Sequence, residues 1–569
     1  MLNGRLYFQA WFVATIALLV AFLTLQPQDE LVPPESVGVF AGDSARAQAQ
    51  DLADTAPLRV PGTDTARAGA RWMHERMTEL PTNGRRVATQ QAYVRVDGVP
   101  TPITNVLYTV PAAAPTKSAR NILVVAPRDA PRQVAGNADD SAVLVELARV
   151  AAQAQYHHTI VFLSVDGDTV GNAGLRWYLR TVDTTRIAGV VVLDGVGGDD
   201  STEVHLWSGG AHRQALALRQ VAEQAVRDAG GVPSAPPSLP AQLIAMAVPE
   251  TRGAQRAAID QRVPAVTLSS RVEAPLAAGM RAPASSERLR LVGMAALNLI
   301  GRLDVRERAR TPDASFLYAG RILRPAVARM ALLLLALPLF VMALDAVARI
   351  RRARVRVSTG LRAVGWKCVP PLAALVVGHL LALAGVLVAP VVGRPPLPAD
   401  MPFTLRDGLV LLLIVLTVAA VSIAVRGRVH AAGANPPAEA AAALLWLSVI
   451  VLFAWWWSPF SLVLILPAAH AALAATVVPR RWQLVALAAV ALAAPVAVVS
   501  AVSRAIDRDV WFTLWYILQT SISGARGLLG PVLAVLVGVC VVSLGTLVLF
   551  RARKGLVGRG WRRELRRTK

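Results

Sequence analysis

Seven long apolar segments follow Arg324, and they limit what this chain can fold into more than any other feature. Each is close to the roughly twenty residues that a helix needs to cross the hydrocarbon core of a bilayer. The segments cover residues 326–347, 368–391, 408–425, 438–455, 460–478, 483–502 and 528–550. An eighth, Leu6–Leu25, is interpreted as an uncleaved signal anchor, because no small-residue cleavage motif directly follows it. The sequence therefore predicts an all-α transmembrane bundle.

The basic residues predict how these spans are oriented. The 569-residue chain has a net charge of +22, but residues 27–323 contain 31 Lys+Arg against 30 Asp+Glu, so the excess belongs to the membrane part. With the N-terminus inside, the arginine-rich segment 349–367 lies on the cytoplasmic side, as the positive-inside rule requires. We expect a multi-pass plasma-membrane protein with both termini cytoplasmic and residues 27–323 extracytoplasmic. Its partner is then the lipid bilayer and not nucleic acid.

Residues 40–305 have the pattern of a folded α/β domain. The apolar runs Asn121–Ala126, Thr159–Val165 and Ala188–Leu193 are typical of strands buried on both faces, and amphipathic helical segments alternate with them. We expect three α/β/α layers around a mixed, mostly parallel sheet. Further helices are expected at 63–80, 141–155, 211–229 and 284–303, and further strands at 90–96, 105–110 and 265–269.

The whole chain then divides into six parts. We predict a signal-anchor helix (1–26), a stalk (27–39), the exported domain (40–305), a linker (306–324), the seven-span domain (325–550) and a basic cytoplasmic tail (551–569). Between the last two predicted spans lies the short aromatic segment Val510–Ile522. It is interpreted as interfacial or re-entrant, and a further span is the alternative.

Acidic residues follow two of the predicted strands, and another opens a predicted helix. The strand that ends at Val165 breaks into Asp166, Gly167 and Asp168, and Asp194 follows the strand after it. Open α/β sheets place their active sites at the carboxyl ends of such strands. The plainer alternatives are turn chemistry for the first group, a structural strand-end carboxylate for Asp194, and helix capping for Asp139.

The order of these motifs resembles the M28 family of zinc exopeptidases, in its membrane-anchored form with a multi-span C-terminal half. The matching segments are AlaProArgAsp at 126–129, GlyAsnAlaAspAsp at 136–140, GluLeuAlaArg at 146–149, AspGlyAspThr at 166–169, LeuAsp at 193–194 and the segment 255–265. The arrangement of spans around the domain also resembles endoplasmic-reticulum M28 metallopeptidases and the GPI-transamidase attachment subunit. The resemblance implies the three-layer fold and a site for two zinc ions.

The same resemblance assigns roles to single positions, and most of these positions are substituted. It implies that Asp168 is the catalytic general base, one methylene shorter than the usual Glu, and that Asp139 and Asp194 are metal ligands. The remaining ligand positions hold Pro127, Thr169 and Gln255. Both imidazole positions are lost, whereas zinc favours nitrogen or sulfur ligands.

We therefore expect a catalytically degenerate, cofactor-free pseudoenzyme that binds a peptide, an envelope-linked substrate or a protein partner at the cell envelope. One alternative is an active zinc aminopeptidase with a rebuilt site, to which His205 or His212 contributes a ligand. The other is transport or lipid handling by the span bundle, where His379, His470 and Glu439 are candidate residues.

Overall fold

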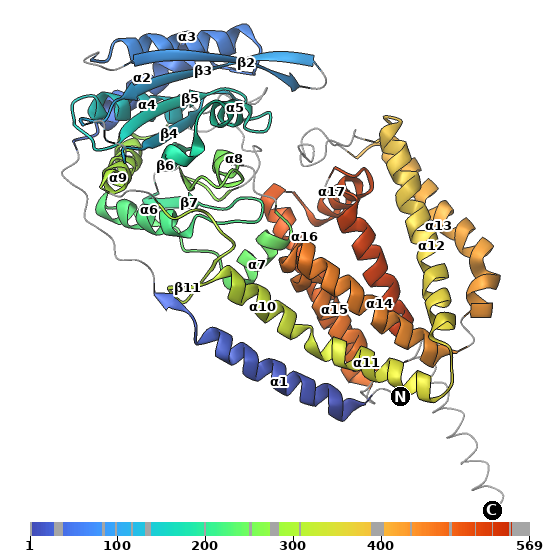
Figure 1. The fold of residues 1–569 in the computed structure, drawn as a ribbon. Coiled ribbons are helices and arrows are strands. Elements are labelled where there is room, and N and C mark those ends of the chain that lie inside the picture. Colours follow the sequence, from blue (N-terminus) through green and yellow to red (C-terminus); the bar gives the residue numbers. More distant parts are fainter. Residues whose placement is uncertain are drawn as a thin grey trace, which may run out of the picture. The chain divides into compact units, whose positions relative to one another are not determined.

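The computed structural model divides into two compact units, Met1–Leu25 with Ala326–Lys569 and Gln26–Pro325 (Figure 1). The residues it describes are 3–27, 38–81, 86–96, 99–114, 116, 118–130, 138–198, 201–249, 253–273, 284–305, 309–387, 403–432, 435–476, 481–506, 508–525, 527–545 and 548. Most of the predicted stalk and all of the predicted tail lie outside them.

The unit Gln26–Pro325 is built on a sheet of eight strands, and this sheet is mixed, as the sequence predicts. The strand order is β2-β3-β5-β4-β6-β9-β7-β8. Its strands are β2 (Arg86–Val96), β3 (Val99–Val110), β4 (Asn121–Pro127), β5 (Thr159–Val165), β6 (Ile187–Leu193), β7 (Glu203–Trp207), β8 (Val232–Pro233) and β9 (Ala265–Ser269). The central strands β5, β4, β6 and β9 are parallel, so their carboxyl ends meet at one edge. The hairpin β2–β3 and strand β7 join them antiparallel.

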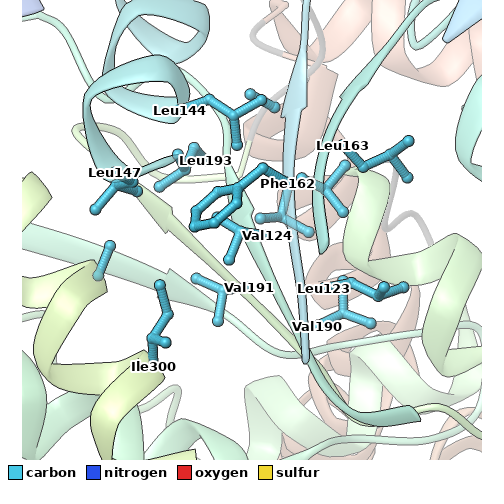
Figure 2. Packing of buried hydrophobic residues seen from close by; sticks show 14 of the residues in the cluster. Leu123, Val124, Leu144, Leu147, Phe162, Leu163, Val190, Val191, Leu193 and Ile300 are labelled. Carbon is cyan, nitrogen blue, oxygen red and sulfur yellow. The ribbon is translucent and has the colours of Figure 1, made fainter. Parts of the chain in front are cut away.

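Helices cover both faces of this sheet. They are α2 (Gly42–Thr55), α3 (Asp64–Thr78), α4 (Ala138–Ala151), α5 (Ala173–Thr181), α6 (Leu216–Asp228), α7 (Leu239–Ala247), α8 (Ala254–Ile259) and α9 (Ser286–Asp304). Helices α2, α4, α6 and α9 pack on one another, while α5 packs on α8. Successive side chains of β4 point to opposite faces of the sheet. Val124 points toward Leu147 of α4 and Ile300 of α9, and Leu123 points away from them (Figure 2).

Several elements differ from the prediction, each for a local reason. The helix expected at 211–229 begins only at Leu216, because Gln214 forms β-bridges with Gly209 and Asp313. Strand β7 and helix α7 were not predicted, since Glu203 and His205 interrupt the apolar residues of β7 and α7 starts inside a proline-rich stretch. Part of the segment predicted as a linker forms β10 (Phe316–Tyr318) and β11 (Arg321–Leu323), which join β1 (Gln26–Pro27) in a small antiparallel sheet.

The other unit is helical. Its helices are α1 (Gly4–Phe22), α10 (Pro325–Leu335), α11 (Leu337–Arg352), α12 (Val357–Leu383), α13 (Leu405–Ala432), α14 (Pro436–Trp457), α15 (Leu462–Ala475), α16 (Arg481–Ile506) and α17 (Val510–Ile522). Within the described residues, five helical stretches are long and apolar enough to cross a membrane, with α10 and α11 together forming one of them. Shorter apolar helices at Gly4–Val20, Pro459–Ala475 and Leu529–Gly545 coincide with three further predicted spans. These features indicate a membrane protein, and the count of seven spans after the domain stays a prediction.

Candidate functional site

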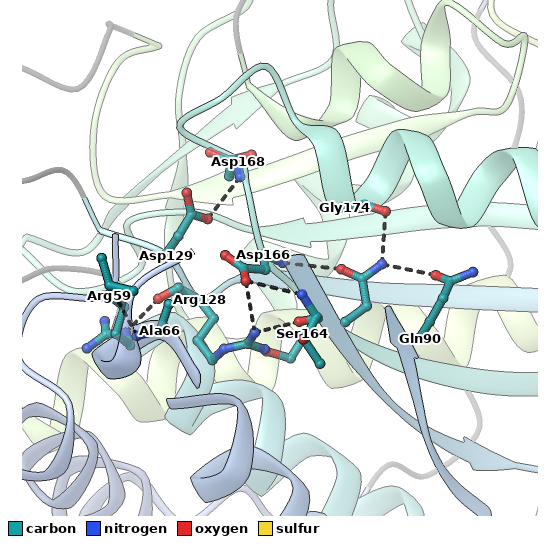
Figure 3. Close-up of polar contacts among 12 residues, drawn as sticks. Arg59, Ala66, Gln90, Arg128, Asp129, Ser164, Asp166, Asp168 and Gly174 are labelled. Carbon is teal, nitrogen blue, oxygen red and sulfur yellow. Dashed lines mark hydrogen bonds and ion pairs between the residues drawn. The ribbon is translucent and has the colours of Figure 1, made fainter. Parts of the chain in front are cut away.

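The acidic loop after β5 is held in place by one buried carboxylate, that of Asp129. Its Oδ1 accepts a hydrogen bond from the backbone N–H of Asp168 at 2.9 Å (Figure 3). Its Oδ2 accepts from the N–H of Thr169 at 2.8 Å. The Thr169 hydroxyl donates to the same Oδ2 at 2.6 Å. Burial raises the pKa of Asp129, and these three bonds oppose that rise. Thr169 therefore serves a structural role at the predicted ligand position.

A buried ion pair lies under this loop. The Arg128 guanidinium is 3.8 Å from Oδ2 of Asp166 and donates to the Ser164 hydroxyl at 2.9 Å and to the carbonyl of Thr104 at 2.6 Å (Figure 3). Arg59 in turn donates to the carbonyl oxygen of Arg128 at 2.6 Å. Burial raises the pKa of Asp166 to about 6, although Arg128 opposes the rise. Asp166 is thus part of the support of the loop.

The two acids at the start of α4 face the loop that follows β6. The Asp140 carboxylate is fully buried and accepts hydrogen bonds from the N–H groups of Gly195 at 2.9 Å and Val196 at 2.8 Å. Burial, followed by the neighbouring Asp194 carboxylate, raises the pKa of Asp140 to about 7. Gly197 lies so close to Asp139 that a Cβ on it would stand 1.9 Å from the Asp139 Oδ2. Both acids therefore approach the carboxyl end of β6.

Asp194, which ends β6, is paired with an arginine that the sequence interpretation missed. The Nη2 of Arg271 lies 3.3 Å from the Asp194 Oδ1. Asp168 belongs to the same cluster: burial, then Asp194 and Asp129, raise its pKa well above the usual value, while Arg271 opposes the rise. Among the described residues, the buried Asp168 Oδ1 and the buried Arg271 Nε have no hydrogen-bond partner. The cluster therefore contains one acceptor and one donor that no described residue satisfies.

The two lost imidazole positions are occupied by residues with structural roles. Pro127 is the last residue of β4 and is opposite Val165 of β5 in the parallel ladder. Gln255 is fully buried, donates to the Glu273 carboxylate at 2.9 Å and accepts from the Thr267 hydroxyl at 2.8 Å. These contacts fix the Gln255 amide in a hydrogen-bonded chain at the start of α8.

The two histidines proposed as replacement ligands have other roles in the structure, one in a hydrogen bond and one in a strand. The ring of His212 is 3.0 Å from the carbonyl oxygen of Met246, and His205 is opposite Ser269 in the β7–β9 ladder. Among the described residues, no group of three or more His, Cys, Asp or Glu side chains is arranged to hold a metal ion. The Asp140 carboxylate is directed at backbone amides and the Asp194 carboxylate at Arg271, so the described residues do not form a zinc site.

The polar candidates of the helical unit make specific packing contacts. The His470 Nε2 lies 2.9 Å from the carbonyl oxygen of Leu335, and its ring centroid is 4.8 Å from that of Trp11. The His379 Nδ1 is 3.1 Å from the carbonyl oxygen of Ser523. Glu439 forms an ion pair with Lys367. These contacts join helices to one another, which is a structural role for all three candidates.

Comparison with solved structures gives neighbours for about half of this chain. An Acidobacteriales bacterium glutaminyl cyclase is 14% identical, with a TM-score of 0.39, over 48% of this chain and 99% of that chain. A putative zinc-dependent exopeptidase from Bacteroides vulgatus is 20% identical, with a TM-score of 0.36, over 48% and 99%. A leucine aminopeptidase precursor from Bacteroides thetaiotaomicron is 18% identical, with a TM-score of 0.38, over 47% and 99%.

No protein-family model and no curated protein matches the sequence. The structural neighbours are therefore glutaminyl cyclase and zinc-dependent exopeptidase folds at low identity. Nothing about the chemistry of this chain follows from them.

Proposed function

We propose that residues 40–305 form a metal-independent binding module with an M28-peptidase-like fold, displayed at the cell envelope by a membrane-embedded bundle. The observation that carries this proposal is the pairing of Arg271 with Asp194 at 3.3 Å. A permanent cation thereby balances one of the two acids that the M28 resemblance assigns to the metal. An arginine does not release its proton at physiological pH, so it cannot act as a general base or carry a nucleophilic water.

Two polar atoms of the cluster that lack hydrogen-bond partners in the described part of the chain suggest the class of ligand. Asp168 Oδ1 accepts and Arg271 Nε donates, and both are buried without a partner among the described residues. A peptide group offers one N–H and one C=O and so matches this pair. Leaving both atoms unsatisfied costs about 1–3 kcal/mol each, which a bound peptide would recover in part. We therefore favour a peptide segment, of an envelope-linked substrate or a protein partner, as the ligand.

The helical bundle is the basis for proposing where in the cell the module lies. The five long apolar stretches and the three shorter apolar helices support a signal anchor followed by seven spans. Together with the positive-inside distribution, this supports cytoplasmic termini and a module outside the plasma membrane. A proteolysis experiment on intact cells tests the topology: protease added outside should cleave within residues 27–323 and leave an epitope on the C-terminus intact.

Metal content and turnover of the full chain, purified in detergent, test the absence of catalysis. We expect no stoichiometric zinc by elemental mass spectrometry and no hydrolysis of aminoacyl substrates. Bound zinc together with turnover that disappears in Asp194→Ala would overturn the proposal and support the aminopeptidase alternative.

Peptide binding is tested on the same preparation by thermal shift with a library of short unmodified peptides. We expect binding peptides to raise the melting temperature of wild type but not of Arg271→Lys, which keeps the charge and loses the planar Nε donor. Arg290→Lys is the matched control, because Arg290 forms an exposed ion pair with Glu287. If Arg271→Lys binds peptides as wild type does, Arg271 is not part of the ligand site.

A further inference from the structure

Six exposed arginines gather where three apolar helices of the helical unit begin or end. Helix α11 ends at Arg352, α12 begins at Val357, and the last turns of α13 contain Arg428 (Figure 1). We call this the basic surface, and its members are Arg351, Arg352, Arg354, Arg356, Arg362 and Arg428. All three helices belong to candidate membrane spans, so these ends lie at a bilayer surface if the helices cross it.

Helices α12 and α13 contact each other at this surface through an aromatic side chain. The Arg428 guanidinium carbon lies 4.8 Å from the ring centroid of Trp366 in α12. Arg362 is four residues before Trp366, so both stand on the same face of α12. A partly buried tryptophan in contact with an arginine matches the side chains that anchor helices at the headgroup level of membranes.

No acid among the described residues neutralises the basic surface. On the helices that pack together here, Asp345 is already paired with Arg349 at 2.8 Å, and Glu439 is paired with Lys367. The remaining acid, Asp407, lies in the first turn of α13, at the opposite end of that 28-residue helix from Arg428. The six arginines of the basic surface form no ion pair with any described residue, so their charge is available to an external anion.

One of the six, Arg354, has a backbone conformation that favours glycine. Arg354 has a φ of 57° and closes α11, with the N–H of Val355 bonded to the carbonyl of Ile350 at 3.1 Å. This left-handed position after a helix is most often glycine, because side chains are strained there. The sequence places an arginine at this position in spite of the strain, which is consistent with a need for its charge.

We propose that the basic surface is a binding site for the headgroup of an anionic phospholipid. The phosphate and glycerol of phosphatidylglycerol carry one negative charge at the depth of the helix ends, whereas phosphatidylcholine is neutral overall. Clusters of four to eight basic residues next to a membrane span attract anionic lipids by roughly 1 kcal/mol per residue. This site is separate from the proposed peptide module, and its existence does not depend on that module.

Native mass spectrometry of the full chain in detergent, titrated with short-chain phosphatidylglycerol or phosphatidylcholine, tests the proposal. We expect phosphatidylglycerol to bind more tightly, and each arginine removed to weaken it about five-fold, the equivalent of roughly 1 kcal/mol. The test variants are Arg351→Gln/Arg352→Gln and Arg354→Gly. The second removes a charge while relieving the backbone, so a loss of binding there cannot come from unfolding. The matched control is Arg504→Gln/Arg508→Gln, outside the basic surface.

Three results would overturn the proposal. The first is equal binding of the two lipids by wild type. The second is unchanged phosphatidylglycerol binding in both basic-surface variants, or an equal loss in the control. The third is displacement of the lipid by an equal concentration of inorganic phosphate, which would show that the surface recognises a free anion and not a lipid.

Discussion

Replacing Asp129 by alanine should loosen the acidic loop and lower the stability of the α/β unit. The substitution leaves three donors without their acceptor, namely the N–H groups of Asp168 and Thr169 and the Thr169 hydroxyl. Each buried donor left unsatisfied costs about 1–3 kcal/mol. Part of this cost is offset, because burial disfavours the Asp129 carboxylate in the folded state and raises its pKa. We therefore expect a net loss of about 2–4 kcal/mol in the free energy of unfolding.

A loss of this size should lower the melting temperature of the unit by about 4–8 °C, at roughly 2 °C per kcal/mol for a large domain. The local assay is amide hydrogen exchange of a peptide that covers residues 166–174, where the amides of Asp168 and Thr169 should lose their protection. Asp183→Ala is the control. Asp183 accepts from the N–H and hydroxyl of Thr185 with similar geometry, but it is exposed, so water can replace its bonds. Unchanged protection of the loop in Asp129→Ala would refute the anchoring role.

Three further predictions concern single contacts. Burial raises the pKa of Asp140 from 3.8 to about 7, so its contribution to stability is complete below about pH 4 and is lost as the pH rises through 7. Melting curves should show a lower melting temperature at pH 8 than at pH 5, and a smaller difference in Asp140→Asn; an unchanged difference would contradict this. Gly197→Ala should destabilise the unit, because its Cβ would stand 1.9 Å from the Asp139 carboxylate, and a wild-type melting temperature would show that this loop yields freely. Lys367→Met should destabilise the helical unit by about 3–5 kcal/mol by leaving Glu439 buried without its cation, and the added change Glu439→Leu should restore much of the loss in thermal melts.

The sequence predicted the centre of the fold better than its edges. Strands β4, β5, β6 and β9 agree with the prediction to within a residue or two, because their short, mostly apolar runs are typical of strands buried on both faces. The hairpin β2–β3 is longer than predicted, since its partly exposed residues mix polar and apolar types without a clear period.

The site was predictable in its residue types but not in its pairings. Asp168 and Asp194 follow buried strands, so their place at one sheet edge could be predicted. That Asp129 would hold the loop after β5, and that Arg271 would pair with Asp194, depends on loop conformations that a single sequence does not specify. The one available signal for Arg271 was its position two residues after β9, at the same edge as the acids.

In the small sheet formed by β1, β10 and β11, the first and last segments of the α/β unit lie side by side. Gln26 is opposite Ile322, and the Arg324 Nε donates to the Gln26 Oε1 at 2.9 Å, so the chain enters and leaves the unit one strand apart. Such a unit has the form of an insertion between two consecutive helices, α1 and α10, and genetic events could add, remove or exchange it without stretching the chain on either side. During synthesis, β1 cannot pair with β11 until Ile322 has been made. The pairing of β1 with β11 is therefore among the last steps in folding this part of the protein.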